Sequence, residues 1–332
     1  MPKIRSLGLW AVLGASGACA PEATSEVTGT RNLYGVVAGA AADGSNDLCP
    51  DGFARGVAAR SGSARQVASM TPAPEGVTVC PGGDVFVARD PSGEVWRVQL
   101  DGQQELWATL GDRRPAGITC DEQGRLFVAT FATQSGQAGS LGPVMISEQG
   151  EAPVELPQPA AAKPIAGLNG IVAAPGVGVY ASDTSNGNLL LWQESSPGVF
   201  AARVVASDLP LANGLAYAPG VRALFVNASG SWQLLQFKVG DDGALDDRRA
   251  VPVPFMLFMD GVAVDEEGDL YVADWLAGSV VRVSTRRSVL RIANPASMAF
   301  RGGTLLVTDY KLGDARAAGG LYAVDLGVCG AY

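Results

Sequence analysis

The sequence contains no histidine among its 332 residues. This absence excludes serine–histidine–aspartate and cysteine–histidine triads, imidazole acid–base catalysis and zinc sites ligated by histidine. Any catalysis by this chain must therefore use carboxylates, hydroxyls, amines, thiols, or a metal ion held by oxygen atoms.

Positive charge is also scarce, because 24 Lys and Arg residues stand against 33 Asp and Glu residues, for a net charge of −9. A surface that binds phosphate needs clustered Lys and Arg side chains, so we expect no nucleic-acid partner. An acidic chain is better suited to cations or neutral ligands.

Long apolar runs are missing as well, since no stretch of the sequence approaches 18 consecutive apolar residues. We therefore expect no transmembrane helix. Charged residues make up only 17% of the chain and hydrophobic residues 47%, which favours a large folded core over disorder. The 43 glycines and the short Val-rich runs favour an all-β protein with many tight turns.

The N-terminus has the pattern of an export signal. Lys3 and Arg5 precede an apolar run from Leu7 to Ala18, and Cys19 follows in a sequence similar to a bacterial lipobox. We predict a signal peptide over residues 1–19 and lipid attachment at Cys19. The protein would then be an exported lipoprotein of the bacterial cell envelope, in the periplasm or at the outer membrane surface, and otherwise a secreted protein. We expect membrane contact only through the N-terminal lipid.

Residues 20–60 are rich in Ala, Gly, Ser and Thr and have weak periodicity, so we interpret them as a tether and an irregular lead-in.

The rest of the chain, residues 61–332, is built from a repeated pattern. In each unit a turn precedes a short strand, and a second turn leads to a strand that usually has an aromatic second residue. The leading glycines of five units are spaced by 41, 53, 44 and 47 residues, and a sixth unit without this glycine begins near Ser297. The five glycines are Gly76, Gly117, Gly170, Gly214 and Gly261. Repeats of 40 to 50 residues are typical of propellers and solenoids.

Four alternating strands per unit and six units predict a six-bladed β-propeller with four-stranded antiparallel blades. The last unit lacks an outer strand, and the segment Ala64–Met70 is available to supply it. We therefore predict that an N-terminal outer strand closes the ring and removes an exposed sheet edge.

The exported context permits disulfides among the four cysteines that follow Cys19. Cys49 and Cys329 are candidate partners across the closure of the ring. Cys80 and Cys120 end neighbouring inner strands, where either a disulfide or two small buried thiols would fit. For that pair we favour buried thiols.

A set of polar residues stands directly before the leading glycines, where each innermost strand begins. The set is Glu75, Asn169, Asn213 and Asp260, with Ala116 and Ala296 at the corresponding positions of the other blades. A propeller would bring these positions together at one mouth of its central channel. Facing carboxylates repel one another unless a cation lies between them. Carboxylate and amide oxygens suit one hard divalent ion, Ca²⁺ first, followed by Mg²⁺ or Mn²⁺, with Zn²⁺ also allowed.

A simpler interpretation is that a polar residue followed by Gly is good turn chemistry, since Asn and Asp bond their own backbone in turns. That interpretation accounts for single positions, but it gives no reason for Glu75, because Glu is a poor turn former. The recurring Asp183, Asp274 and Asp309, by contrast, favour a structural turn role.

The dipeptides Glu75-Gly76, Asn169-Gly170, Asn213-Gly214 and Asp260-Gly261, at blade spacing, resemble the gluconolactonase, senescence marker protein and luciferin-regenerating enzyme family of six-bladed propellers. The closing segment GGLYAVDLGVCG from Gly319 is also similar to that family. The resemblance covers residues 64–329. Some members that act on sugar lactones have Arg where this chain has Gly167, and Asp where it has Gly170.

This resemblance implies a single divalent metal ion held by Glu75, Asn213 and Asp260, and hydrolysis of a lactone or a related ester. Asp260 would also act as the base that activates water, and Asn169 would contact water or substrate near the metal ion. We expect a monomer with a small-molecule substrate.

Loops that follow the second strand of each blade should surround the same mouth, and Trp232, Trp275 and Tyr310 are candidates for its apolar walls. The same rings could instead pack between blades. An alternative function is a non-catalytic binding propeller of the cell envelope, similar to NHL propellers, that recognises a sugar, a peptide or a protein.

Overall fold

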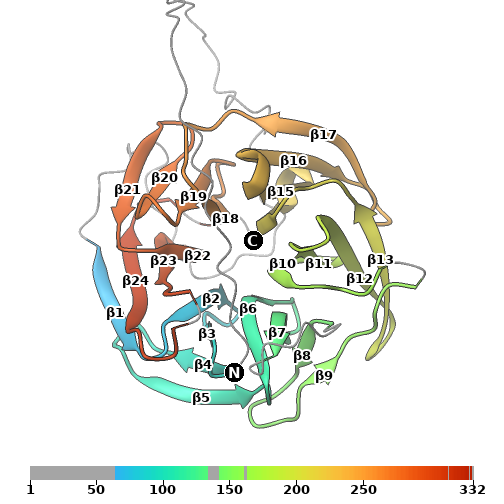
Figure 1. Ribbon diagram of the computed structural model, residues 1–332, viewed down its shortest axis with the longest axis horizontal. Coiled ribbons are helices and arrows are strands. Elements are labelled where there is room, and N and C mark those ends of the chain that lie inside the picture. The colour runs from blue at the N-terminus through green and yellow to red at the C-terminus, as the bar shows by residue number, and fades with distance from the viewer. Residues whose placement is uncertain (1–63, 134–141, 161–162, 313, 329, 331–332) are drawn as a thin grey trace, which may run out of the picture. The chain divides into compact units, whose positions relative to one another are not determined.

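A computed structural model describes residues 64–133, 142–160, 163–312, 314–328 and 330. Within these residues the chain forms 24 strands and two short 3₁₀ helices, η1 (Pro219–Val221) and η2 (Ser229–Ser231). The strands make six four-stranded antiparallel sheets arranged in a ring (Figure 1). The predicted all-β, six-bladed propeller is therefore confirmed. In the described part of the chain no helix is long and apolar enough to cross a bilayer.

In five blades the strands follow one another in chain order from the central channel outward, and in the sixth β22, β23 and β24 are followed by β1. The innermost strands are β2 (Pro74–Val79), β6 (Arg113–Cys120), β10 (Leu168–Ala174), β14 (Ala212–Ala218), β18 (Met259–Val264) and β22 (Pro295–Arg301). The second strands are β3 (Val85–Arg89), β7 (Leu126–Thr133), β11 (Gly178–Asp183), β15 (Ala223–Ala228), β19 (Leu270–Asp274) and β23 (Thr304–Asp309). The third strands are β4 (Glu94–Val98), β8 (Val144–Ile146), β12 (Asn188–Ser196), β16 (Gln233–Val239), β20 (Ser279–Arg282) and β24 (Gly319–Asp325). The outer strands are β5 (Gln104–Thr109), β9 (Val154–Glu155), β13 (Val199–Ala206), β17 (Leu245–Val251), β21 (Arg287–Arg291) and β1 (Arg65–Met70).

The N-terminal strand closes the ring as predicted. β1 pairs antiparallel with β24, with Arg65 opposite Ala323 and Met70 opposite Gly319 (Figure 1). Every blade is thus completed between Arg65 and Asp325. The propeller has its own closed set of sheets and needs no strand from residues 1–63 to complete a blade.

The aromatic residue of the repeat fills the space between neighbouring blades. Phe127, Tyr180, Phe225 and Tyr271 each occupy the second strand of their blade and are fully buried. Each packs among apolar side chains of two adjacent sheets. In these four blades the repeated pattern therefore places a large ring where sheet packs on sheet.

Cys80 and Cys120 form a disulfide that joins the ends of β2 and β6, with their Cα atoms 5.2 Å apart. The preference for two buried thiols was wrong. Neighbouring innermost strands approach closely at the channel, which brings the two side chains within bonding distance. Cys19, Cys49 and Cys329 lie outside the described residues, as do the signal peptide and the tether, so those predictions stand untested.

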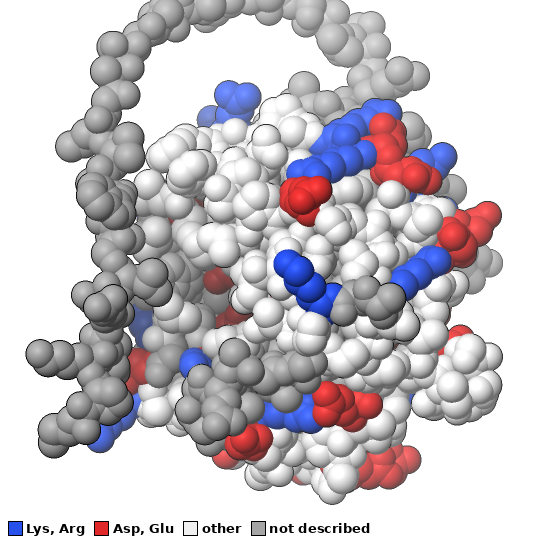
Figure 2. All heavy atoms as spheres, turned by 45° about the vertical axis from the view of Figure 1, so that its right-hand side comes forward, with Lys and Arg blue, Asp and Glu red and all other residues white. Residues whose placement is uncertain are grey.

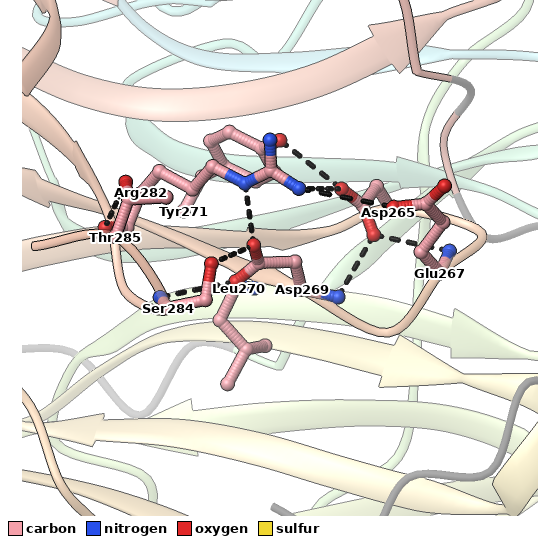
Figure 3. Close-up of polar contacts among 8 residues, drawn as sticks. All are labelled: Asp265, Glu267, Asp269, Leu270, Tyr271, Arg282, Ser284 and Thr285. Carbon is pink, nitrogen blue, oxygen red and sulfur yellow. Dashed lines mark hydrogen bonds and ion pairs between the residues drawn. The ribbon is translucent and has the colours of Figure 1, made fainter. Parts of the chain in front are cut away.

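A buried network of charges lies at the end of blade five that is farther from Asp260. Asp265 accepts bonds from the Glu267 and Asp269 amides and from the Tyr271 hydroxyl, while Arg282 binds Asp269 (Figure 3). The hydroxyl and amide of Ser284 donate to the same Asp269 carboxylate. Because these carboxylates already have donors, we assign the network to holding the β18–β19 turn and not to ligand binding.

Candidate functional site

The polar–glycine dipeptides lie at β-bulges near the start of the innermost strands. The pairing register shifts around Glu75 in β2, Asn169-Gly170 in β10, Asn213-Gly214 in β14 and Asp260-Gly261 in β18. A bulge removes residues from the regular ladder and re-aims their side chains. The bulges therefore let the polar side chains leave the plane of each sheet at one mouth of the channel.

The glycine of each dipeptide has a packing role. A Cβ atom on Gly214 would lie 2.4 Å from the carbonyl oxygen of Asp260 in the next blade. A Cβ atom on Gly76 would lie 2.3 Å from the carbonyl oxygen of Ala116. Only glycine allows this close approach between blades. The residue before the glycine does not have this constraint, which leaves it free to carry chemistry.

Three of the predicted residues converge. The side chain of Asn213 hydrogen-bonds to the carboxylate of Asp260, and the Asp260 charge acts on Glu75. All three side chains are buried. Two carboxylates and one amide, from blades one, four and five, thus meet in one buried region.

This burial changes the acidity of both carboxyl groups. Burial raises the pKa of Glu75 well above its usual range, with the Asp260 and Asp90 charges adding to the effect and Arg114 opposing it. Burial also raises the pKa of Asp260 to about 7, although the bond from Asn213 acts in the opposite direction. Two buried acids that repel each other are poorly stabilised in their ionised forms unless a cation joins them.

Two oxygen atoms of this site have no hydrogen-bond partner despite being buried, namely Glu75 Oε2 and Asn213 Oδ1. Buried acceptors without donors are uncommon in folded proteins. Oxygen atoms of this kind fit the ligand preference of a hard divalent cation. Among the described residues no group of three or more Cys, Asp or Glu could hold a metal ion. A cation here would therefore need the Asn213 amide as a ligand beside the two carboxylates.

A second polar cluster, which the sequence did not indicate, lies beside Glu75. Arg114 of β6 donates to both oxygens of the buried Asp90 carboxylate at 2.6 Å, and the Tyr310 hydroxyl donates to Asp90 Oδ2 at 2.5 Å. The Arg114 guanidinium also stacks on Phe131, 4.6 Å from the ring centroid. The cluster links blades six, one and two at the mouth that carries Glu75.

The sequence feature that could have indicated this cluster is the position of Asp90 relative to the recurring aspartates of the other blades. Asp183 and Asp274 pair with the first residues of their inner strands and accept bonds from backbone amides of the preceding loop, which supports their predicted turn role. In blade one the corresponding residue is Arg89, which donates to the carbonyls of Thr71 and Pro72. Asp90 is therefore an additional acid, one residue beyond the recurring position.

The four predicted substrate contacts have different environments. Asn169 is partly exposed and lines the channel with Glu75 and Asp260. Tyr310 is buried, and Trp275 packs beside it and donates its indole N–H to the Tyr310 carbonyl at 3.3 Å. Trp232 follows η2 and is largely exposed. Trp232, Trp275 and Tyr310 are not part of the channel lining, and their contact with substrate stays a prediction.

The central channel is a cavity of about 990 Å³. Its wall runs along the innermost strands, from Glu75 and Asp260 to Cys80 and Cys120 at the other end. A cavity of this size can hold a small organic ligand. On the face displayed in Figure 2, Lys and Arg lie beside Asp and Glu, with uncharged surface between such groups. That face offers no continuous basic surface of the kind that a phosphate backbone requires.

The fold and the site define a six-bladed propeller with a carboxylate and amide cluster at one mouth. Residues 176–310 match the SMP-30/gluconolactonase/LRE-like region, so the resemblance seen in the sequence is confirmed. No curated protein matches the sequence.

Solved structures agree with this fold. A gluconolactonase from Xanthomonas campestris is 19% identical, with a TM-score of 0.62, over 81% of this chain and 91% of that one. A luciferin-regenerating enzyme is 16% identical, with a TM-score of 0.61, over 81% of this chain and 97% of that one. A virginiamycin B lyase from Staphylococcus aureus is 14% identical, with a TM-score of 0.54, over 74% of this chain and 82% of that one. The expectation of an enzyme is consistent with the match of residues 176–310 to the family model.

Proposed function

We propose that this protein is a metal-dependent hydrolase of a lactone or a related ester. One divalent cation, Ca²⁺ in the first place, would be held by Glu75, Asn213 and Asp260. The observation that carries the proposal is the pair of buried oxygens without partners, Glu75 Oε2 and Asn213 Oδ1, in a site that also contains Asp260. The gluconolactonases with this fold support the choice of reaction.

When bound, the cation would polarise the substrate carbonyl and stabilise the negative charge that develops on its oxygen. Asp260 supplies the base, because its carboxylate is buried in the same site as the Glu75 carboxylate and the Asn213 amide. The carboxylate of Asp260 accepts a proton from water while the water oxygen bonds to the carbonyl carbon. The ring C–O bond then breaks, and the leaving oxygen receives that proton. The product is the hydroxy acid, and Asp260 is again ionised.

The absence of histidine is compatible with this scheme. It also distinguishes the chain from the virginiamycin B lyase, which has a similar fold. A variant of the virginiamycin B lyase that lacks one histidine is described as catalytically inactive. This chain has no histidine, so chemistry that depends on that side chain is not available to it. We assign Asn169, on the channel wall, to contact with substrate or with the attacking water.

The test is a panel of lactones and esters, assayed with and without a chelator, for the wild-type protein and for Asp260→Asn. We expect hydrolysis to require the cation and to fall at least about 100-fold in the variant, as is usual when a catalytic base is lost. Asp265→Asn is the matched control. It removes another buried aspartate whose pKa is about 7, from just beyond the other end of the same strand.

Hydrolysis that is indifferent both to the chelator and to Asp260→Asn would refute the proposal. Tight cation binding without turnover of any lactone or ester would instead favour the non-catalytic binding propeller. Calorimetric titration of Ca²⁺ into the wild-type protein and into Glu75→Gln separates that case from one in which the site binds no cation at all.

A further inference from the structure

Five large apolar side chains are exposed on loops at one end of blades four and five. Their exposed fractions are 47% for Leu211, 61% for Trp232, 84% for Phe255, 49% for Leu257 and 56% for Leu276. We call these five residues the apolar rim. They lie before β14 and in the β15–β16, β17–β18 and β19–β20 connections. Because antiparallel strands alternate in direction, all four segments lie at the end where the innermost strands begin.

The rim is a local concentration of exposed apolar surface. Among the described residues the other exposed large apolar side chains are Leu106, Val154, Val199 and Leu312. The first three are separated on the outer strands β5, β9 and β13, and Leu312 lies at the rim's end of blade six. Scattered apolar residues need no explanation, but a group on one end of two adjacent blades marks an interaction surface.

Three of the four segments that carry the rim have no charged residue, because residues 229–232, 252–258 and 275–278 contain no Asp, Glu, Lys or Arg. The segment before β14 carries one acid, the exposed Asp208. At the opposite end of the same two blades, the turns at 240–244 and 265–269 carry two and four acidic residues. The two ends of blades four and five therefore differ in chemistry, and a partner of the rim must accept an apolar surface with a single acidic residue.

The structure holds the rim in place from beneath. Met256 is buried in the core between the exposed Phe255 and Leu257. The carboxylate of Asp274, itself buried, accepts bonds from the amides of Leu257 at 2.8 Å and Ala277 at 3.2 Å. These contacts present the apolar tips outward and keep the charge of Asp274 away from the surface.

The second rim loop is tied to its neighbours in the same way. The amide of Ser229 donates to the Leu211 carbonyl at 3.2 Å, and the Ser229 hydroxyl donates to the Met259 carbonyl of blade five. The loops of blades four and five are thus bonded to one another at the rim. These hydrogen bonds hold the loops in a fixed arrangement in which the rim residues are exposed.

We propose that the apolar rim docks the propeller onto a lipid bilayer. None of its five residues lines the central channel, and all five are exposed. Trp, Phe and Leu on a surface of low charge are side chains that enter the interfacial layer of a membrane. Since the rim loops have no Lys or Arg, docking does not depend on anionic lipids.

The chain before the propeller can bring the rim to a membrane. Residues 20–63 would span on the order of 150 Å if extended, from the predicted lipid at Cys19 to β1. Among the described residues no strand exceeds nine residues, or about 30 Å, so this length is ample for either end of the propeller to reach the bilayer. Attachment in the same chain raises the effective concentration of the rim at the lipid surface, which makes even a weak contact effective.

The docked orientation has a consequence for the site. The rim is at the same end of the propeller as Glu75 and Asp260. Docking would turn the mouth that carries these residues toward the lipid. Substrates dissolved in the bilayer would then have the shortest path to the site.

The experiment measures binding of the unacylated chain from Ala20 to vesicles of zwitterionic phosphatidylcholine. This chain keeps every strand of the closed propeller and lacks the predicted lipid. We expect co-sedimentation that persists at high salt and weakens at least about ten-fold in the Phe255→Ser/Leu257→Ser variant, because apolar area provides the binding. Brominated lipids should quench tryptophan fluorescence in the wild type, and Trp232→Phe should remove most of that quenching.

Leu106→Ser/Val199→Ser is the matched control, because it removes two exposed apolar side chains from outer strands and should bind vesicles as the wild type does. Equal binding of the wild type and the Phe255→Ser/Leu257→Ser variant would overturn the proposal, as would binding that high salt abolishes. A dimer that only the rim variant dissociates, without vesicle binding by the wild type, would assign the rim to a second copy and also overturn it. Thermal unfolding of each variant verifies that its propeller is intact.

Discussion

Arg114 binds both carboxylate oxygens of Asp90, with Nε–Oδ1 and Nη2–Oδ2 distances of 2.6 Å. The pair joins blade one to blade two beside Glu75, and the hydroxyl of Tyr310 brings blade six to the same carboxylate. Asp90 raises the pKa of Glu75 and Arg114 lowers it. This ion pair therefore stabilises the ring of blades. It also determines the charge next to the candidate cation site.

Arg114→Ala would leave the buried Asp90 carboxylate without its cation. Removing one partner of a buried pair costs about 3–5 kcal/mol. Arg114 is itself 20% exposed, so we expect a loss near the lower limit, about 3 kcal/mol in the free energy of unfolding. Chemical denaturation measures this loss.

The control for this variant is Arg97→Ala, which breaks the exposed pair of Arg97 with Glu105. An exposed pair contributes about 0–1 kcal/mol, so this change should have little effect. Equal losses in the two variants would contradict the structural role assigned to the Asp90–Arg114 pair.

The stability of the cation-free protein should decrease as the pH rises from about 4 to above 7. Burial raises the pKa of Asp260 and of Asp265 to about 7 in the folded state, while an unfolded Asp titrates near 3.9. A raised folded pKa means that the folded state binds more protons in this interval. The stabilisation is therefore complete below the unfolded pKa and is lost as the pH rises through 7. Urea unfolding in a chelator at pH 5.5 and pH 8 measures the change.

Two comparisons test whether the buried carboxyl groups cause that dependence of stability on pH. Asp265→Asn should reduce the difference between pH 5.5 and pH 8, because one of the shifted carboxyl groups is gone. Saturating Ca²⁺ should raise stability at pH 8 more than at pH 5.5, since the ion binds the deprotonated ligands. A wild-type protein that becomes more stable from pH 5.5 to pH 8 in the chelator would contradict the prediction.

The Cys80–Cys120 disulfide closes a loop with a sequence separation of 40 residues. In the chain-entropy account, a loop of this length stabilises the folded state by up to about 4 kcal/mol. We expect Cys80→Ala/Cys120→Ala to lose about 2–4 kcal/mol of unfolding free energy while cation binding is retained, because the bond lies at the far end of the channel from Glu75. A reductant should destabilise the wild type but not this variant. An unchanged wild-type midpoint in reductant would show that the bond contributes little.

The sequence was sufficient to predict the blades and the way the ring closes. The leading glycines and the aromatic residues of the second strands recur because each blade packs on the next in the same way. The repeated residues of one blade therefore predict the arrangement of the whole ring. The unpaired last blade likewise required an outer strand, and Ala64–Met70 was the segment available. Such features follow from repetition and need no knowledge of individual contacts.

Contacts that occur in only one blade could not be predicted in this manner. Arg114 meets Asp90 because neighbouring strands converge at the channel, and no pattern in the sequence links the two residues. The state of Cys80 and Cys120 depends on their separation, which strand assignment does not give. For the candidate site, the sequence indicated Glu75, Asn213 and Asp260, whereas their burial, raised pKa values and unpaired oxygens required the structure.

Gly214→Ala tests whether the glycine of each dipeptide positions the candidate site. The added Cβ would lie 2.4 Å from the Asp260 carbonyl oxygen and 2.7 Å from the Gly261 Cα, both rigid parts of the next blade. Overpacking of this kind typically costs about 1–3 kcal/mol, and here the backbone that must shift also carries Asp260. We therefore expect a loss of stability together with weaker cation binding. Gly220→Ala is the control, because a Cβ there would have nothing within 4 Å. If Gly214→Ala lowers stability but leaves cation affinity at the wild-type value, the close approach serves only to pack the blades, and the position of Asp260 does not depend on it.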